Sequence, residues 1–165
     1  MAKKEIDSTL NGSETMDIMQ KIEEILKHLK LTGTATIVDR NGHILASEMH
    51  GKAIPMTGQI SLLKARQSAH TGDRTGATGE KIETGEVTLT LLGIDPNEFV
   101  PFAGGCPIVD GEGNILGGAG FSEQTAQTDE NIITTAVEAA GFSSKKPKRK
   151  EIPLATIQNV LVTGK

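Results

Sequence analysis

The sequence predicts an α+β domain with a central antiparallel sheet of about five strands and flanking helices. Two near-identical phrases, IVDRNGHIL at 37–45 and IVDGEGNIL at 108–116, place a glycine turn between apolar runs, which is typical of a β-hairpin. Three segments with apolar residues at helical spacing lie before, between and after these hairpins. Because hairpins pair antiparallel and amphipathic helices cover a sheet, this order favours one layered domain.

Three helices are predicted from apolar spacing and end signals. The first occupies 13–33, with Ser13 as its N-cap. The second begins near Pro55 and ends at His70, and the third follows a Thr-Asp-Glu start and ends at Gly141. The expected apolar stripe of the first helix consists of Met16, Met19, Ile22, Ile25, Leu26 and Leu29.

The strands are predicted from turn signals and alternation. Residues 34–50 indicate strand, turn and strand around Asn41-Gly42, because a type I′ turn needs positive φ at both central residues. The segment VTLTLLG at 87–93 alternates apolar residues with threonine, which predicts a fifth, half-buried strand. Before it, residues 71–86 hold four glycines and are expected to form a mobile loop.

The length of 165 residues fits one domain with a single core. We expect a disordered N-terminus over 1–12, the folded domain over 13–142, and a basic linker with a C-terminal tail over 143–165. The tail is expected to be dispensable for folding, because its basic run cannot bury a core. Within it, ATIQNVLV at 155–162 is expected to add an edge strand or to dock on a partner subunit.

Composition argues against several classes of protein. The chain has no apolar run near the ~18 residues of a membrane span, and its first residues lack the apolar core of a signal peptide. The single cysteine, Cys106, excludes an internal disulfide and fits a reducing cytoplasm. The absence of Trp and Tyr disfavours single-stranded nucleic-acid binding. We therefore expect a cytoplasmic protein with no membrane association.

Charge is distributed unevenly along the chain. The tail from Ser143 carries six basic residues against Glu151 alone, a net charge of +5, whereas the remainder carries 11 basic and 20 acidic residues, a net charge of −9. An acidic body argues against nucleic acid as a partner. The basic run indicates a nuclear-import signal, a polyanion contact, or a solvated linker that lies against the acidic body or a neighbouring subunit.

Four stretches occur in the order found in the GlcG/HbpS family, a small α/β domain also present at the C-terminal end of PduO-type adenosyltransferases. They are IVDRNGHILASE, GQISLLKARQSA, FVPFAGGCPIVDGEGNILGGAGFS and QTDENIITTA, and the resemblance covers residues 14–141. The resemblance implies a profilin/PAS-like fold, assembly into homo-oligomers, and haem or a related tetrapyrrole as the ligand. This sequence departs from the family in Cys106, where an aliphatic residue is usual, and in its longer tail.

A ligand site is predicted around FAGGCPI and the glycine-rich stretch after the second hairpin. Without side chains, Gly104 and Gly105 allow backbone N–H groups to approach a ligand closely. Alternatively, these glycines serve a bulge and tight helix-on-sheet packing. Lys64 matches the family's lysine and is expected to pair with an anionic ligand group, to act as a desolvated amine, or to form a surface ion pair. The predicted ligand-binding residues are Lys64, Phe102, Gly104, Gly105, Cys106, Pro107 and Ser122.

The histidines show no metal-ligand spacing. If haem binds as the family implies, His50 is the candidate axial ligand, and Cys106 is either a thiolate ligand or a small buried apolar residue.

Two functions stay open from the sequence. The first is an oligomeric binder of haem or a related tetrapyrrole. The second is a small lyase, isomerase or hydrolase for a carboxylated metabolite, without a nucleotide cofactor. In that enzyme Lys64 and the start of the last helix hold the carboxylate, and Glu48, His50 or Glu123 moves protons.

Overall fold

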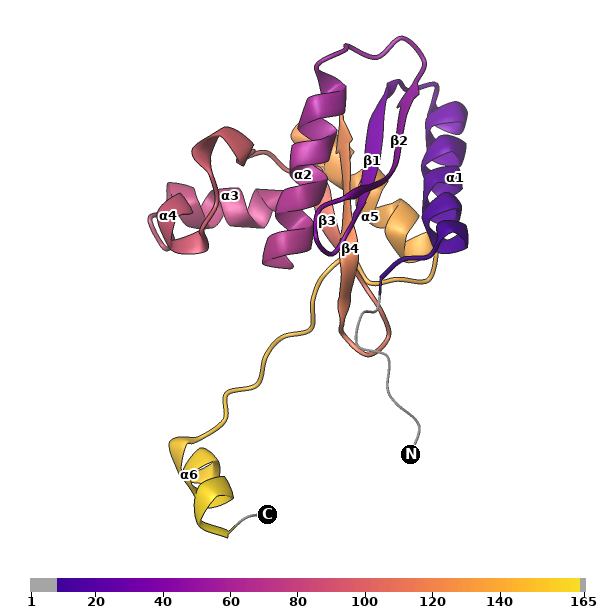
Figure 1. Ribbon diagram of the computed structural model, residues 1–165. Helices are drawn as coiled ribbons and strands as arrows, with labels where there is room; N and C mark the ends of the chain where they lie inside the picture. The colour runs from indigo at the N-terminus through magenta and orange to yellow at the C-terminus, as the bar shows by residue number, and fades with distance from the viewer. Residues whose placement is uncertain (1–8, 164–165) are drawn as a thin grey trace.

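The computed structural model describes residues 9–163 and contains a four-stranded antiparallel sheet in the order β2-β1-β4-β3 (Figure 1). The α+β fold class predicted from the sequence is confirmed. Residues 1–8, most of the terminus predicted to be disordered, lie outside the described part. In chain order the elements are α1 (Gly12–Leu29), β1 (Gly33–Asp39), β2 (Ile44–His50), α2 (Thr57–Thr71), α3 (Thr75–Glu83), α4 (Leu89–Leu92), the 3₁₀ helix η1 (Pro96–Glu98), β3 (Gly105–Val109), β4 (Ile115–Ser122), α5 (Ala126–Ala139) and α6 (Leu154–Thr163).

The two repeated phrases form hairpins with the same turn. Asp39 Oδ1 accepts the N–H groups of Asn41 and His43 at 2.8 and 2.9 Å. Asp110 Oδ1 accepts the N–H groups two and four residues on at 2.9 and 2.8 Å. Each aspartate thus ties down the backbone of its turn, as Asx turns do. The repetition in the sequence is therefore a repetition of turn chemistry.

The sheet is covered on both faces. Helices α1 and α5 pack on each other and on one face, while α2 crosses the other face (Figure 1). The larger core lies on the side of α1 and α5 and includes Phe121, Ile37 and Ile133, each fully buried. On the side of α2 the buried apolar cluster is smaller, with Val38, Ala65 and Ala69.

Helix α2 lies unusually close to β4 because β4 carries glycines there. A Cβ on Gly118 would overlap the carbonyl oxygen of Ala65, and one on Gly120 would overlap that of Ser61. Both oxygens belong to the α2 backbone, which cannot move aside as a flexible side chain can. The glycine-rich strand is therefore the surface on which α2 rests.

The outer edge of β3 is closed to further strands. The N–H of Gly105 donates to Thr75 Oγ1 at 3.0 Å, and Val109 exchanges backbone hydrogen bonds with Ser143 at 2.9 and 3.0 Å. Between them stands Pro107, which has no N–H. The opposite edge strand, β2, is largely exposed along its length.

The predicted fifth strand at 87–93 is wrong, so the sheet has four strands rather than about five. Thr88 instead caps α4, with its Oγ1 accepting the N–H of Leu91 at 3.1 Å, and Gly93 ends that helix in the left-handed region with φ 67°. The preceding segment, predicted to be a mobile loop, contains α3. The profilin/PAS-like likeness stays a prediction.

The first helix starts earlier than predicted. Its N-cap is Asn11, which forms a capping box with Glu14, rather than Ser13. It ends at Lys30 in the left-handed conformation rather than at Gly33. Met16 and Leu29, expected on the apolar stripe, are 60% and 56% exposed, because they lie at the margins of the packed face.

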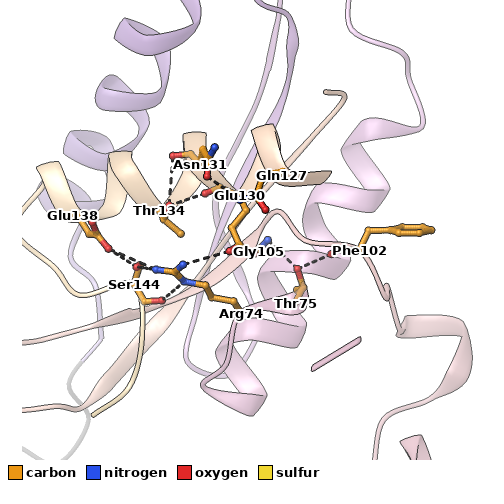
Figure 2. A network of polar contacts seen from close by, with 10 residues as sticks. All are labelled: Arg74, Thr75, Phe102, Gly105, Gln127, Glu130, Asn131, Thr134, Glu138 and Ser144. Atoms are coloured by element: carbon orange, nitrogen blue, oxygen red, sulfur yellow. Dashed lines mark hydrogen bonds and ion pairs between the residues drawn. The ribbon is translucent and has the colours of Figure 1, made fainter. Parts of the chain in front are cut away.

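Part of the tail belongs to the folded body. Ser144 is 1% exposed, and its Oγ donates to Glu138 at 2.6 Å and accepts from Arg74 at 2.7 Å (Figure 2). The same guanidinium contacts Glu130 of α5 at 3.3 Å. Arg74 thus ties the start of the tail to α5 and α3, so ordered contacts continue beyond 142.

We expect Gly118→Ala to lower the free energy of unfolding by about 3 kcal/mol, because its methyl group would press α2 away from the sheet. The control is Gly58→Ala in the first turn of α2, where a Cβ would meet nothing within 4 Å. That control should be neutral or stabilising by up to about 1 kcal/mol. Urea denaturation of both variants measures the difference, and a Gly118→Ala protein as stable as the wild type would contradict the packing argument.

Truncation after Phe142 should lower the melting temperature by about 5–10 °C, because it removes the hydrogen bonds of Ser143 and Ser144. Truncation after Lys150 keeps these contacts and should leave the melting temperature nearly unchanged. Differential scanning calorimetry of the two shortened chains makes the comparison. Equal melting temperatures would show that the Arg74 network does not stabilise the body.

Candidate functional site

A buried ion pair joins α2 to the start of α5. Lys64 Nζ lies 3.0 Å from Asp129 Oδ2 and donates to the carbonyl oxygen of Phe121 at 2.9 Å. Both charged side chains are only 3% exposed. Lys64 therefore forms neither the surface ion pair considered from the sequence nor a contact with the exterior, and its ammonium group links two elements of the fold.

The carboxylate of Asp129 also holds the end of β4. Its Oδ1 accepts the N–H of Gln124 at 2.9 Å. Burial raises the pKa of Asp129, although Lys64 and the backbone N–H groups of Gln124 and Glu123 act in the opposite direction. Without Lys64, the carboxylate would be a buried and poorly compensated charge.

The predicted glycine pair lies against this ion pair. A Cβ on Gly104 would come within 2.6 Å of Lys64 Nζ, and one on Gly105 would come within 2.6 Å of the Lys64 carbonyl oxygen. The Gly105 N–H already donates to Thr75, whose hydroxyl in turn donates to the Phe102 carbonyl oxygen (Figure 2). Protein atoms thus fill the space on this side of both glycines, which favours the packing alternative over ligand approach.

The other predicted ligand-binding residues are divided between the interior and the surface. Cys106 is fully buried in the larger core, and burial raises the pKa of its thiol far above its usual range, so it is a neutral apolar residue here. Pro107 is buried in β3, and Ser122 is 6% exposed at the end of β4. Phe102 is 63% exposed. Phe102 is thus exposed, whereas Cys106, Pro107 and Ser122 are buried like Lys64.

His50 occupies the end of the edge strand β2. It pairs with Gly33, and a Cβ on Gly33 would meet the Phe121 ring, so the imidazole faces the same side of the sheet as α1. Within residues 9–163, His50 Nε2 is a buried nitrogen with no hydrogen-bond partner.

Glu123 is held in an unusual backbone conformation directly after β4. Its φ of 150° is rare for a residue with a side chain, a strain of about 1–3 kcal/mol. Its carboxylate accepts from Thr32 Oγ1 at 3.0 Å and from the Ile54 N–H at 3.2 Å. Glu123 therefore joins the ends of three segments, and both carboxylate oxygens are already hydrogen-bonded.

The described residues hold no cluster of metal ligands, and four hollows on the surface lie away from Lys64 and His50. Across the described residues, no group of three or more His, Cys, Asp or Glu side chains could hold a metal ion. Four surface hollows of about 340 to 420 Å³ lie over the β3–β4 turn and the tail, between α2 and α3, beside Phe102, and on α1. Neither Lys64 nor His50 lines any of these four.

The family model for haem degrading proteins of the HbpS-like type matches residues 10–138. The chain belongs to the HbpS-like family. The match covers the sheet and α1 to α5 but ends before the Arg74-bound Ser144 and before α6. No curated protein matches the sequence at a significant level.

Solved structures share the fold of this HbpS-like chain. Protein ORFY of Klebsiella pneumoniae superposes with a TM-score of 0.74 at 21% identity, covering 85% of this chain and 96% of its own. The haem complex of PduOC gives 0.75 at 20% identity, with coverage of 84% and 99%. A double mutant of Streptomyces reticuli HbpS gives 0.71 at 20% identity, with coverage of 86% and 96%.

Sequence reasoning missed two partners in this region. Asp129 appeared only as an acidic residue in the first turn of a helix, and Arg74 appeared only inside a presumed loop. The signal for Asp129 was a lysine beside the apolar face of α2, because a lysine in that position needs a buried acid. Nothing in the sequence identified which acid, since 65 residues separate the pair.

We expect Lys64→Met to lower the free energy of unfolding by about 3–5 kcal/mol at neutral pH, because it strands the Asp129 carboxylate in a buried site. The folded-state pKa of Asp129 would then rise further above its unfolded value. An acid with a raised folded pKa stabilises the fold while protonated, and that stability is lost as pH rises through the folded pKa. The loss should therefore be smaller at about pH 5 than at about pH 8.

Chemical denaturation at the two pH values measures this dependence. The double variant Lys64→Met with Asp129→Asn is the control, since it has no buried carboxylate to titrate. It should show a weaker pH dependence than the single variant. An equal loss at both pH values in the single variant would exclude a charged Asp129 as the cause.

Proposed function

We propose that this HbpS-like protein binds haem or a related tetrapyrrole through His50. The observation that carries the proposal is the buried Nε2 of His50, which lacks a hydrogen-bond partner in the described residues. A buried polar atom without a partner is costly, and a metal ion can use its lone pair. The family's description as haem degrading and the haem complex of the similar PduOC fold support the same ligand.

The residues at this position fit a haem iron in their chemistry. A neutral imidazole is a common axial ligand, and bound haem would supply a redox-active iron. Cys106 does not fit that role, because its thiol is neutral and fully buried on the core side of β3. His50 instead stands at the end of the exposed edge strand β2, on the side of the sheet that faces α1.

The contacts of Lys64 and Glu123 favour binding over acid–base catalysis. The Lys64 ammonium is engaged by Asp129 and Phe121, and the Glu123 carboxylate is engaged by Thr32 and Ile54. Groups that hold the fold in this way are not free to take up and release substrate protons. A cytoplasmic location and a homo-oligomeric state accompany the proposal and rest on the single cysteine and on charge complementarity.

Titration of the apo protein with hemin should produce a Soret band that saturates at a fixed stoichiometry. His50→Ala should shift the band and weaken binding by about tenfold or more, because the iron loses its protein ligand. Absorbance spectra recorded across the titration measure both effects. Absorbance that rises without saturating would exclude specific haem binding by the wild type.

Two matched variants separate ligation from general effects. His28→Ala removes an exposed histidine from α1 and should leave the titration unchanged. Cys106→Ala should likewise keep the Soret position, because the thiol is not a ligand. If binding saturates but His50→Ala behaves like the wild type, the haem site lies elsewhere on the molecule.

A further inference from the structure

The C-terminal helix α6 has no apolar partner in the body. Every residue from Pro147 to Val162 is exposed, and Leu161 and Val162 are 88% and 83% exposed. Figure 1 shows α6 standing clear of the sheet at the end of an extended segment. A ten-residue helix is not stable alone in water, so α6 needs a surface to pack on.

The second group of exposed apolar side chains lies along the edge strand β2 and the segment between β2 and α2. We call these residues the edge group: Ile44, Leu45, Met49, Ile54 and Met56, which are 40% to 64% exposed. Ile44 and Met49 pair with Val38 and Thr34 of β1, on the face that α2 covers further along the sheet. Together, the edge group and the segment from Ile152 to Val162 hold most of the exposed large apolar side chains.

Geometry places these two surfaces on opposite sides of one protein chain. The tail leaves the body beside β3, where Ser143 pairs with Val109, whereas the edge group borders β2 at the other edge. The ten residues from Ser144 to Pro153 can span at most about 33 Å. To reach its own edge group, α6 would have to pass around a complete layer of helices. A second copy presents the same surface with no such obstacle.

Charge favours the same partner. The segment between the body and α6 is strongly basic, and the body has a net charge of −9. A second copy therefore attracts the linker while its edge group accepts the helix. The residues of α6 are unsuited to a lipid surface, because the helix has no basic residue on its polar side and no aromatic residue.

We propose that α6 docks on the edge group of a second copy of this chain. In this arrangement the basic linker lies across the acidic body of the second copy. When each copy docks its α6 on the edge group of the other, the result is a closed dimer. The apolar side chains of α6 and of the edge group are then buried in both copies. The family match ends at residue 138, so this docking is an addition that the matched domain does not itself provide.

Interchain disulfide formation in the full-length protein tests the docking. One chain carries Leu161→Cys and the other carries Ile44→Cys, while the native Cys106 is fully buried and does not react. After mixing and mild oxidation, we expect a disulfide-linked dimer of the two different chains on a non-reducing gel. Replacing Ile44→Cys by Leu91→Cys, a position on α4 that is even more exposed (74% against 52%), should give little product.

Second-site variants show whether the helix face carries the interaction. Adding Ile157→Asp to the Leu161→Cys chain should reduce the linked product by about tenfold or more, because a charge would have to be buried. Thr156→Asp, on the polar side of α6, should have a much smaller effect. Melting curves of the Ile157→Asp and Thr156→Asp chains, compared with that of the body truncated after Lys150, show whether the variants remain folded.

Three results would overturn the proposal. The first is the absence of the mixed dimer at protein concentrations up to about 100 μM. A dissociation constant above that concentration would leave the chains mostly unpaired in solution. The second is a chain carrying both cysteines that closes only on itself, which would mean docking within one copy. The third is co-sedimentation with phosphatidylserine-containing vesicles that is lost in Ile157→Asp, without any interchain disulfide.

Discussion

The close approach of α2 to β4 is the constraint on which the rest of the structure depends. Glycines at 118 and 120 let backbone rest on backbone, so α2 lies low over the centre of the sheet. This depth brings the Lys64 ammonium past the strand to Asp129 on the opposite layer. A side chain on either glycine would lift the helix and separate the charges. The buried ion pair therefore depends on helix packing, because the two glycines of β4 determine how far the Lys64 side chain can reach.

The hairpins and main helices could be predicted from the sequence because their signals are local. The glycine after Asn41 marks a turn within four residues, although Asn41 lacks the positive φ of the predicted type I′ turn and only Gly42 has it. The apolar spacing of α5 likewise lies within one segment. The segment at 87–93 was wrongly predicted as a strand because its alternation also fits a capped helix, with Thr88 at one end and Gly93 at the other. Residues far from this segment in the sequence exclude it from the sheet. They close the outer edge of β3, where another strand could have paired.

Prediction of the site reached a similar limit. The sequence identified Lys64 and the glycine pair as belonging together, and the structure brings them within contact of each other. It could not show that the space between them is filled, because that depends on how deeply α2 sits. The orphan nitrogen of His50 is a property of its surroundings rather than of residue type. Histidine at the end of a strand is otherwise an ordinary surface residue.

The two edges of the sheet differ in whether they can pair with a further strand. On β3, Thr75, Pro107 and Ser143 leave no run of free N–H groups for a foreign strand, whereas β2 keeps its outer side accessible. Association by strand pairing can therefore take place at one edge only. Two copies that meet there use up both free edges, so a sheet continuing through the pair has closed ends. Growth into fibres requires two complementary free edges on every copy. The closed outer edge of β3 leaves each copy with one, so such growth is blocked.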